Sequence, residues 1–310
     1  MNEVVRINQN TQLVSLLSVS WVDDFINFMD VTEKSISTYK RALKQFVRYL
    51  QGNGIASPQR QDVISFREEL KKDHKPTTVQ LYMVSIRLFF KWLEQKGLYK
   101  NIADNIKGAK ISKEHKKDCL TTKQIKSILS NIDRSTLTGK RDYAILTLMI
   151  TGGLRTIEVS RADIEDLRPL GDDTVLYIQG KGREEKTDYV KIVPEVEDAI
   201  RTYLKALGNT KHKSPLFMST SNNNTGGRLS TRSISGIVKT HFKNAGYDSD
   251  RLTAHSLRHT TGTINLKNGG TLEETQQLLR HSNINTTMIY LHHLQRADNK
   301  SEERVASAIF

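Results

Sequence analysis

Apolar residues in the first third of the chain recur at spacings of three and four, which is the period of an amphipathic helix. One such stripe covers residues 36–50 and a second covers residues 79–93. Shorter stripes at residues 21–29 and 63–70 predict two further helices. Together the four stripes predict a small helical bundle over roughly residues 15–106, with the aromatic side chains in its core.

The polar faces of the two longer predicted helices are rich in lysine and arginine. Such faces suit an anionic partner, and the candidates for contacting it are Lys40, Arg41, Lys44, Arg48, Arg87 and Lys91. The bundle is followed by KGAKISKEHKKD, residues 107–118, which is basic and almost free of large apolar residues. A run of this kind packs no core, so it predicts an interdomain linker. Lys116 and Lys117 in this linker are further candidates for contacts to the anion.

A second domain is expected over residues 119–310. LTTKQIKSILSNI predicts a helix with Thr121 or Thr122 as its cap, and RDYAILTLMITGGLR predicts a more apolar helix that ends at its glycine pair. TVLYIQG and YVKIV are short β-rich segments, and the polar connection KGREEKTD between them suits a hairpin. After Pro194 the pattern returns to helices. The predicted fold is therefore mainly α with a small β-sheet in the second domain.

The overall charge of the chain indicates a class of binding partner. The chain has 47 Lys and Arg against 34 Asp and Glu, for a formal net charge of +13. Such an excess favours a polyanion, of which nucleic acid is the commonest. The alternative is a basic surface that only keeps the protein soluble.

Composition also excludes several classes of protein. No apolar run approaches the roughly 20 residues that span a bilayer. The N-terminus lacks the basic start and apolar block of a secretory signal, so a cytoplasmic protein is expected. Cys119 is the only cysteine, which excludes an intrachain disulfide and a thiolate zinc cluster.

Two polar features of the second domain are candidates for chemistry near its predicted hairpin. In TGGLRTIEV, Arg155 follows a glycine-terminated helix, and Glu158 is placed three residues on to hold its guanidinium. In IQGKGREEKTDYV, Lys181 lies at the tip of the hairpin. Taken singly, a surface arginine and a turn lysine need no special explanation.

Two more features follow towards the C-terminus. HSLRHTTGT carries His255 and Arg258 one helical turn apart. LLRHSNINTTMIYLHH carries His281 nine residues before Tyr290. The order Arg, Lys, His-x-x-Arg, His, Tyr resembles that of the tyrosine recombinase (phage integrase) family, and the resemblance covers nearly the whole chain.

The resemblance implies a fold and an activity. The fold is an N-terminal helical core-binding (SAM-like) domain and a mixed α/β catalytic domain, which together form a clamp around DNA. The activity is site-specific recombination, in which Tyr290 attacks DNA to give a 3′-phosphotyrosyl intermediate and two rounds of exchange resolve a Holliday junction. No metal or other cofactor is implied.

The resemblance also implies a role for each of the other site residues. Arg155 and Arg258 would bind the scissile phosphate, since guanidiniums match phosphate geometry, and Glu158 would support them. His255 would assist proton transfer and His281 would hydrogen-bond the phosphate. Lys181 would protonate the leaving 5′-oxygen. Lys186, also in the hairpin, is not excluded as that acid. Because a free tyrosine has a pKa of about 10, the cationic pocket is expected to favour the phenolate.

The implied partners are double-stranded recombination sites and further copies of this chain. Members of the family act as tetramers on two DNA sites. The tail QRADNKSEERVASAIF is polar and then apolar, which suits exchange of the C-terminal tail between subunits; packing on its own domain is the alternative. Accessory DNA-bending proteins are a further partner that the resemblance allows.

Two positions depart from the family pattern. Arg280 stands where a glycine usually precedes the second histidine, so either Arg280 adopts the backbone of that turn or the turn differs. A contact from Arg280 to a DNA phosphate is a further hypothesis. Thr261 and Gly262 replace the usual Phe-Ala, which is expected to alter packing and not chemistry. These departures favour an enzyme that integrates and excises a mobile element.

Other functions remain open at this point. An Xer-like resolvase of chromosome dimers or plasmids would use the same residues. A type IB topoisomerase shares the Tyr, Arg, Lys and His chemistry, although the helical N-terminal domain and the short, Xer-like spacing argue against it. A non-catalytic DNA-binding accessory protein is the alternative outside the enzymes.

Overall fold

The structure is a computed structural model that describes residues 19–111, 118–180, 183–208, 211–297 and 299–310. The chain divides into two units, Met1–Glu114 and His115–Phe310. Lys116, Lys117 and Lys181 lie outside the described residues, and the linker predicted at residues 107–118 is described only in part. Among the described residues, no helix is both long and apolar enough to cross a membrane.

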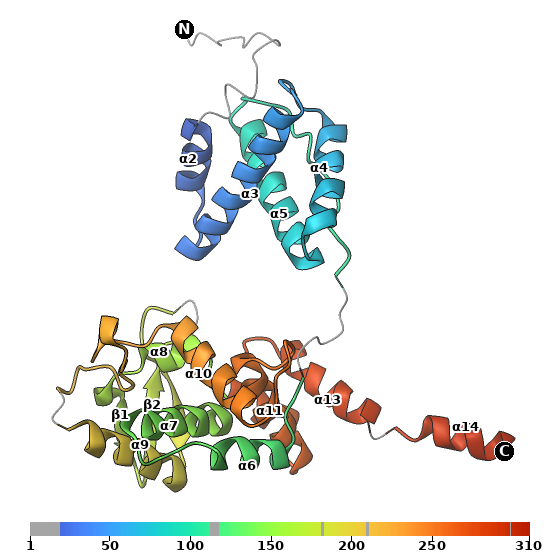
Figure 1. Ribbon diagram of the computed structural model, residues 1–310. Helices are drawn as coiled ribbons and strands as arrows, with labels where there is room; N and C mark the ends of the chain where they lie inside the picture. The colour runs from blue at the N-terminus through green and yellow to red at the C-terminus, as the bar shows by residue number, and fades with distance from the viewer. Residues whose placement is uncertain (1–18, 112–117, 181–182, 209–210, 298) are drawn as a thin grey trace. The chain divides into compact units, whose positions relative to one another are not determined.

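The first unit is a bundle of helices, as the four apolar stripes predict (Figure 1). Its helices are α2 (Val19–Phe28), α3 (Glu33–Gly52), α4 (Arg60–Asp73) and α5 (Pro76–Gln95). Proline is favourable at the start of α5, because its missing N–H would have no helical partner there. Helix α4 begins with a capping box, in which the Asp62 carboxylate accepts from the backbone N–H of Gln59 at 2.6 Å.

Aromatic side chains fill the core of this bundle. Phe25 meets Phe89 edge to face at a centroid distance of 5.4 Å, and Phe46 lies 5.1 Å from Phe66. These rings are buried, which confirms that the aromatic stripes form the core. After α5 the chain folds back onto the same core through Ile106, whose carbonyl accepts a hydrogen bond from Arg87 Nη1 at 2.6 Å.

The second unit combines helices with a three-stranded antiparallel sheet of order β1-β2-β3. The strands are β1 (Leu167–Leu170), β2 (Asp173–Ile178) and β3 (Asp188–Ile192). Leu176 of β2 pairs with Leu167 on one side and with Val190 on the other. The predicted β2–β3 hairpin is confirmed, whereas the sequence did not predict β1.

Several helices of this unit pack around α7. In chain order the helices of the unit are α6 (Thr122–Ser130), α7 (Leu137–Gly152), α8 (Thr156–Arg161), α9 (Pro194–Leu207), α10 (Thr231–Asn244), α11 (Ala254–Lys267), α12 (Leu272–Leu279), α13 (Asn285–Ala297) and α14 (Ser301–Ile309). The cap of α6 is Thr121, whose hydroxyl accepts from Gln124 N. Helix α7 contacts α9, α10, α11 and β3, which explains why its sequence is apolar on several faces (Figure 1).

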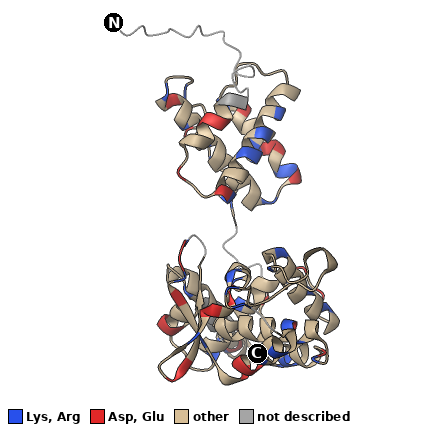
Figure 2. Ribbon diagram, turned by 90° about the vertical axis from the view of Figure 1, so that its left-hand side faces the viewer, with Lys and Arg blue, Asp and Glu red and all other residues tan. Residues whose placement is uncertain are grey.

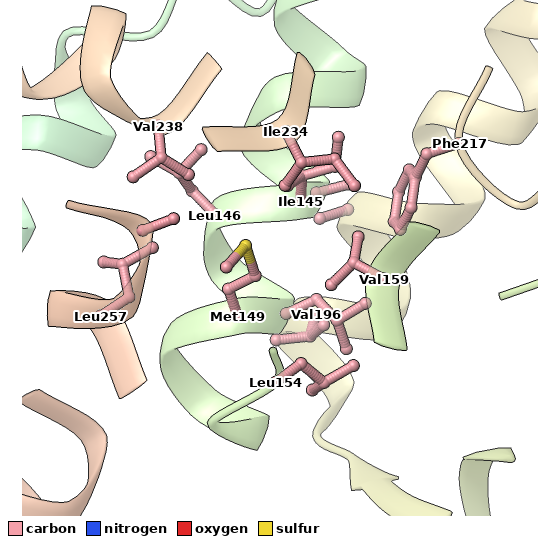
Figure 3. Close-up of a cluster of buried hydrophobic side chains, with 14 of the residues drawn as sticks. Ile145, Leu146, Met149, Leu154, Val159, Val196, Phe217, Ile234, Val238 and Leu257 are labelled. Atoms are coloured by element: carbon pink, nitrogen blue, oxygen red, sulfur yellow. The ribbon is translucent and has the colours of Figure 1, made fainter. Parts of the chain in front are cut away.

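The core of the second unit is aliphatic around α7 (Figure 3). The cluster contains Ile145, Leu146 and Met149 of α7 together with Val238 of α10 and Leu257 of α11. This packing fixes the C-terminal end of α7 against α11, and that junction carries the candidate site. The last helix, α14, has no buried residue, and its apolar side chains Val305 and Ile309 are exposed.

Candidate active site

The turn between α7 and α8 places the first arginine. Gly153 ends α7 at φ 58°, and a Cβ there would lie 2.6 Å from a Leu279 methyl, so only glycine fits without a shift. Arg155 then caps α8 and donates twice to Glu158, from its backbone N at 2.8 Å and from Nη1 at 2.7 Å. The Arg155 side chain is 28% exposed, and Glu158 beneath it is buried. The contact predicted from their spacing is therefore present.

Arg258 lies deeper than Arg155, on α11. The residue is 1% exposed, and its guanidinium donates to the carbonyls of Gly153, at 2.6 Å, and Leu279. Burial, followed by the charges of Arg155 and Arg280, lowers the pKa of Arg258 to about 9. The side chain stays charged at neutral pH, and its guanidinium is fixed between two segments far apart in the sequence.

Arg280 has the backbone conformation of the glycine that it replaces, with φ 52° and ψ 48° at the end of α12. Its side chain turns inward and is 10% exposed. The guanidinium donates to Leu278 O at 2.6 Å, Gly152 O at 3.1 Å and Glu158 Oε2 at 3.1 Å. Arg280 thus shares the carboxylate that holds Arg155. A contact from Arg280 to a DNA phosphate stays a prediction.

Tyr290 lies on α13 and is 3% exposed. Its ring lies nearly parallel to that of His281 at 6.3 Å and edge to face with His259 at 5.1 Å. A Cβ added to Gly262 would lie 3.2 Å from the tyrosine ring, so the missing side chain leaves room for it on α11. Thr261 donates to Ile150 O at 2.6 Å and so ties α11 to α7. Gly262 therefore acts on the packing around the tyrosine, and Thr261 acts on the packing of α11 against α7.

Burial has the largest effect on the resting state of the tyrosine. Burial raises the pKa of Tyr290 to about 12, because the opposing charges of Arg258 and Arg155 offset only part of the loss of hydration. The arginines favour the phenolate, as expected, but burial outweighs them in this state. The side chain of Tyr290 is therefore a neutral phenol at neutral pH.

The histidines differ in exposure. His281 is partly buried, and its Nδ1 lies 2.9 Å from the hydroxyl of Thr287. Burial and the nearby arginines lower the pKa of His281 to about 4, so the ring is neutral at pH 7. His255 is exposed in the first turn of α11 and meets the ring of His259 at 4.4 Å. His259, which the motif did not single out, therefore lies between His255 and Tyr290.

The β2–β3 hairpin carries two candidate lysines, of which the structure describes one. Lys181 lies outside the described residues, so its place relative to the tyrosine stays a prediction. Lys186 Nζ lies 2.7 Å from Asp163 and 2.5 Å from Asp166. Burial alone would lower the pKa of Lys186, but these two carboxylates raise it. A lysine held charged by two carboxylates is a poor proton donor, which favours Lys181 as the acid.

Two family models match the chain, namely the phage integrase family over residues 118–296 and the N-terminal SAM-like domain of phage integrases over residues 20–97. The chain belongs to the phage integrase family.

Relatives in the family are named tyrosine recombinases. The chain is 30% identical over 287 residues to tyrosine recombinase XerD of Listeria innocua serovar 6a, which covers 87% of this chain and 93% of the relative. It is 31% identical over 240 residues to tyrosine recombinase XerC of Caldanaerobacter subterraneus subsp. tengcongensis. That match covers 74% of this chain but only 64% of the relative's length. A lambda integrase tetramer bound to a Holliday junction shares the fold, with a TM-score of 0.68 at 15% identity over 87% of this chain and 76% of that one.

The candidate DNA contacts of this phage integrase family member have different surroundings. Lys40, Arg41, Lys44 and Arg48 are exposed on α3, and Lys91 is exposed on α5. Figure 2 shows lysines and arginines on the helices of the first unit, interspersed with acidic residues. Arg87 is partly buried against Ile106 O and serves the bundle itself. The exposed residues on α3 stay the stronger candidates.

Two features of the site were missed by motif reading. His259 follows Arg258 directly, and its place against the tyrosine depends on the packing of α11 on α13. The inward direction of Arg280 was also missed, because its partner Glu158 is 122 residues away in the chain. The only sequence signal for either was the departure from the family pattern at residues 261–262 and 280.

Proposed function

We propose that this member of the phage integrase family is a site-specific DNA recombinase that cuts and rejoins DNA through a 3′-phosphotyrosyl intermediate. One observation supports this above all others. A buried tyrosine, Tyr290, lies close enough to the guanidiniums of Arg155 and Arg258 for their charges to lower its pKa. A tyrosine ester needs a tyrosine held beside the phosphate, and guanidiniums stabilise the charge that grows on the phosphate oxygens.

The proposed reaction has two steps, cleavage and rejoining. The Tyr290 oxygen attacks the phosphorus, a P–O bond to tyrosine forms, and the P–O5′ bond breaks. The phenolic proton leaves with the help of His255, and Lys181 protonates the departing 5′-oxygen. A 5′-hydroxyl from a second duplex then attacks the tyrosyl ester, so rejoining needs no outside energy source.

The resting phenol fits this scheme. A neutral, buried tyrosine is a weak nucleophile, so the chain does not attack DNA indiscriminately. Binding of the phosphate beside Arg155 and Arg258 places the reacting phosphorus near the ring. Proton removal then coincides with attack. His281, neutral at pH 7, can donate one ring N–H to the phosphate while the other nitrogen contacts Thr287.

We propose double-stranded DNA sites and three further copies of this chain as the partners, with the action in the cytoplasm. The lambda integrase tetramer on a Holliday junction supports the tetramer, and the exposed apolar side chains of α14 support exchange of the tail between subunits. Accessory DNA-bending proteins fit the same assembly. The departures from the family pattern support integration and excision of a mobile element. The names of the curated relatives, XerC and XerD, favour a resolvase of chromosome dimers or plasmids as the second candidate.

Capture of the covalent intermediate tests the proposal. The full chain is incubated with a pool of nicked duplexes that carry a randomised central sequence, and the products are separated on a denaturing gel. A nick just beyond the cleavage point lets the short fragment that carries the new 5′-hydroxyl diffuse away, so rejoining is prevented and the tyrosyl ester accumulates. The native chain should give a DNA-linked band whose sequence identifies the site.

Tyr290→Phe should give no such band, because the ring keeps its packing and loses only the oxygen. Tyr177→Phe is the matched control, since it removes the same atom on strand β2 and should leave the band unchanged. A band of native intensity with Tyr290→Phe would show that another residue is the nucleophile.

A further inference from the structure

Arg280 is held in a backbone conformation that a long side chain rarely adopts. Among the described non-glycine residues, only Asn105 and Arg280 have a positive φ, at 53° and 52°. Asparagine tolerates this region, whereas an arginine there is strained. Strain of this kind persists when the surrounding contacts determine the conformation, and it gathers at functional sites. The contacts of the Arg280 side chain should therefore explain why an arginine stands at this position.

The guanidinium of Arg280 connects the two arginines of the proposed phosphate site. Glu158 binds Arg155 through Oε1 at 2.7 Å and Arg280 through Oε2 at 3.1 Å. The carbonyl of Gly153 accepts from Arg258 at 2.6 Å and from Arg280 at 3.3 Å. Arg280 thus contacts one partner of each arginine, and its loss would free both of those partners to move.

The cluster also carries an excess of positive charge. Arg155 and Arg280 share the buried carboxylate of Glu158, while Arg258 donates to the carbonyls of Gly153 and Leu279. The neighbouring Asp188 is paired with Arg183 at 2.7 Å. Within the part of the chain that the structure describes, Arg280 Nε is buried and has no hydrogen-bond partner. A buried cationic cluster with too few acceptors is prepared for an anion.

We propose that Arg280 is a positioning residue for the proposed recombination reaction, which holds Glu158 and the Gly153 carbonyl so that Arg155 and Arg258 are set for the scissile phosphate. This inference rests on the proposed function. We expect Arg280 to affect the rate of cleavage and not the affinity for DNA, because its side chain is buried against Glu158 and the Gly153 carbonyl.

The variant Arg280→Gly separates this role from the backbone. Glycine adopts a φ of 52° without strain, so the variant keeps the turn and loses only the guanidinium. On the DNA captured by the native chain, adduct formation should slow about 10- to 100-fold, the usual loss when a residue that orients a functional group is removed. The DNA dissociation constant and its salt dependence should stay within about twofold, since Arg280 itself is not assigned a phosphate contact and the other DNA contacts remain.

Chemical rescue gives a readout that a purely structural role would not change. A cavity of about 640 Å³ between β3 and α12 is lined by Gly152, Arg280 and His281. Guanidinium chloride at millimolar concentration should reach the vacated site and restore part of the rate of Arg280→Gly. Arg280→Lys, which keeps a charge without the fork, should fall between the glycine variant and the native chain. Asn105→Gly is the control, since it replaces the other described non-glycine residue with a positive φ by glycine and should cleave at the native rate.

Three results would overturn the inference. Cleavage by Arg280→Gly at the native rate would show that the Arg280 side chain has no role in cleavage and that the residue only ends α12. A loss of DNA affinity in proportion to the loss of rate would make it a DNA contact. A slow glycine variant that guanidinium does not rescue at all would assign the loss to the turn.

Binding of inorganic phosphate decides the same question without DNA chemistry. Phosphate should raise the melting temperature of the native chain more than that of Arg280→Gly, and equal rises would refute the positioning role. If the native chain forms no adduct with any duplex, the proposed function fails, and the difference in phosphate binding still decides the arrangement of the arginines.

Discussion

The two units of this protein bury different kinds of side chain. In the described part of the first unit, the core is aromatic and aliphatic, and Ser85 is its only buried polar residue. The second unit buries arginine, aspartate, glutamate and histidine as well as serines and threonines. Many of these lie on α11 and at its junction with α7, α8 and α12. The polar burial therefore coincides with the candidate site.

The difference teaches where each unit is sensitive to change. An apolar core is held by contact area and tolerates substitutions that keep volume. A buried polar network holds together only while each donor and acceptor keeps its partner, since an unpaired charge in a protein interior is strongly unfavourable. We therefore expect volume to decide stability in the first unit and charge pairing to decide it in the second.

The largest expected effect is in the aromatic core. Phe89→Ala should lower the free energy of unfolding of the first unit by about 3–5 kcal/mol, because it leaves a cavity against Phe25 and Trp92. Both tryptophans, Trp21 and Trp92, lie in this unit, so tryptophan fluorescence during urea unfolding reports on it alone.

Phe89→Leu is the control for this prediction. It keeps most of the volume and should lose less than about 1.5 kcal/mol. An unchanged urea midpoint for the alanine variant would contradict the view that volume controls the first unit.

A change of charge at constant shape should act on the second unit. Glu158→Gln removes the carboxylate shared by Arg155 and Arg280 and should lower the free energy of unfolding by about 3 kcal/mol. The loss should appear in the far-ultraviolet circular dichroism transition, while the tryptophan fluorescence transition stays in place.

The exposed residue Glu273 supplies the matched control on α12. Glu273→Gln should change the stability by less than about 0.5 kcal/mol. Equal losses for the two glutamine variants would mean that the buried network does not depend on its charge.

The same contrast explains how far the sequence alone predicts the structure. The four helices of the first unit follow from spacings of three and four, because a single apolar face per helix is enough to build a bundle. The hairpin of β2 and β3 follows from two β-rich segments around a polar connection. Strand β1 does not, since Leu167–Leu170 is short, mostly exposed and contains Pro169.

The sequence predicts which residues form the site but not their protonation states. Motif order identified Arg155, Arg258 and Tyr290, which the fold brings together from α8, α11 and α13. The sequence predicts the effect of the arginines on the tyrosine but not the larger effect of burial, because burial depends on Gly262 and the packing of α11. The direction of the Arg280 side chain likewise depends on a partner distant in the sequence.

The smallest expected effect is a dependence on pH that belongs to the second unit alone. The pKa of His281 falls to about 4 in the folded chain, from burial first and the nearby arginines second, against 6.5 for a free side chain. The folded state thus disfavours the charged ring. Its contribution to stability is complete above pH 6.5 and is lost as the pH falls towards 4.

His281 is partly exposed and solvent screens its charge, so this loss should amount to about 1–2 kcal/mol. Urea unfolding followed by circular dichroism at pH 7, 5.5 and 4.5 measures it, with His281→Asn as the variant that cannot titrate. Acidification should destabilise the native chain more than this variant, and tryptophan fluorescence should show no such difference. Parallel pH profiles by circular dichroism would mean that the ring takes up its proton without penalty, and that the polar interior of the second unit is more hydrated than its burial indicates.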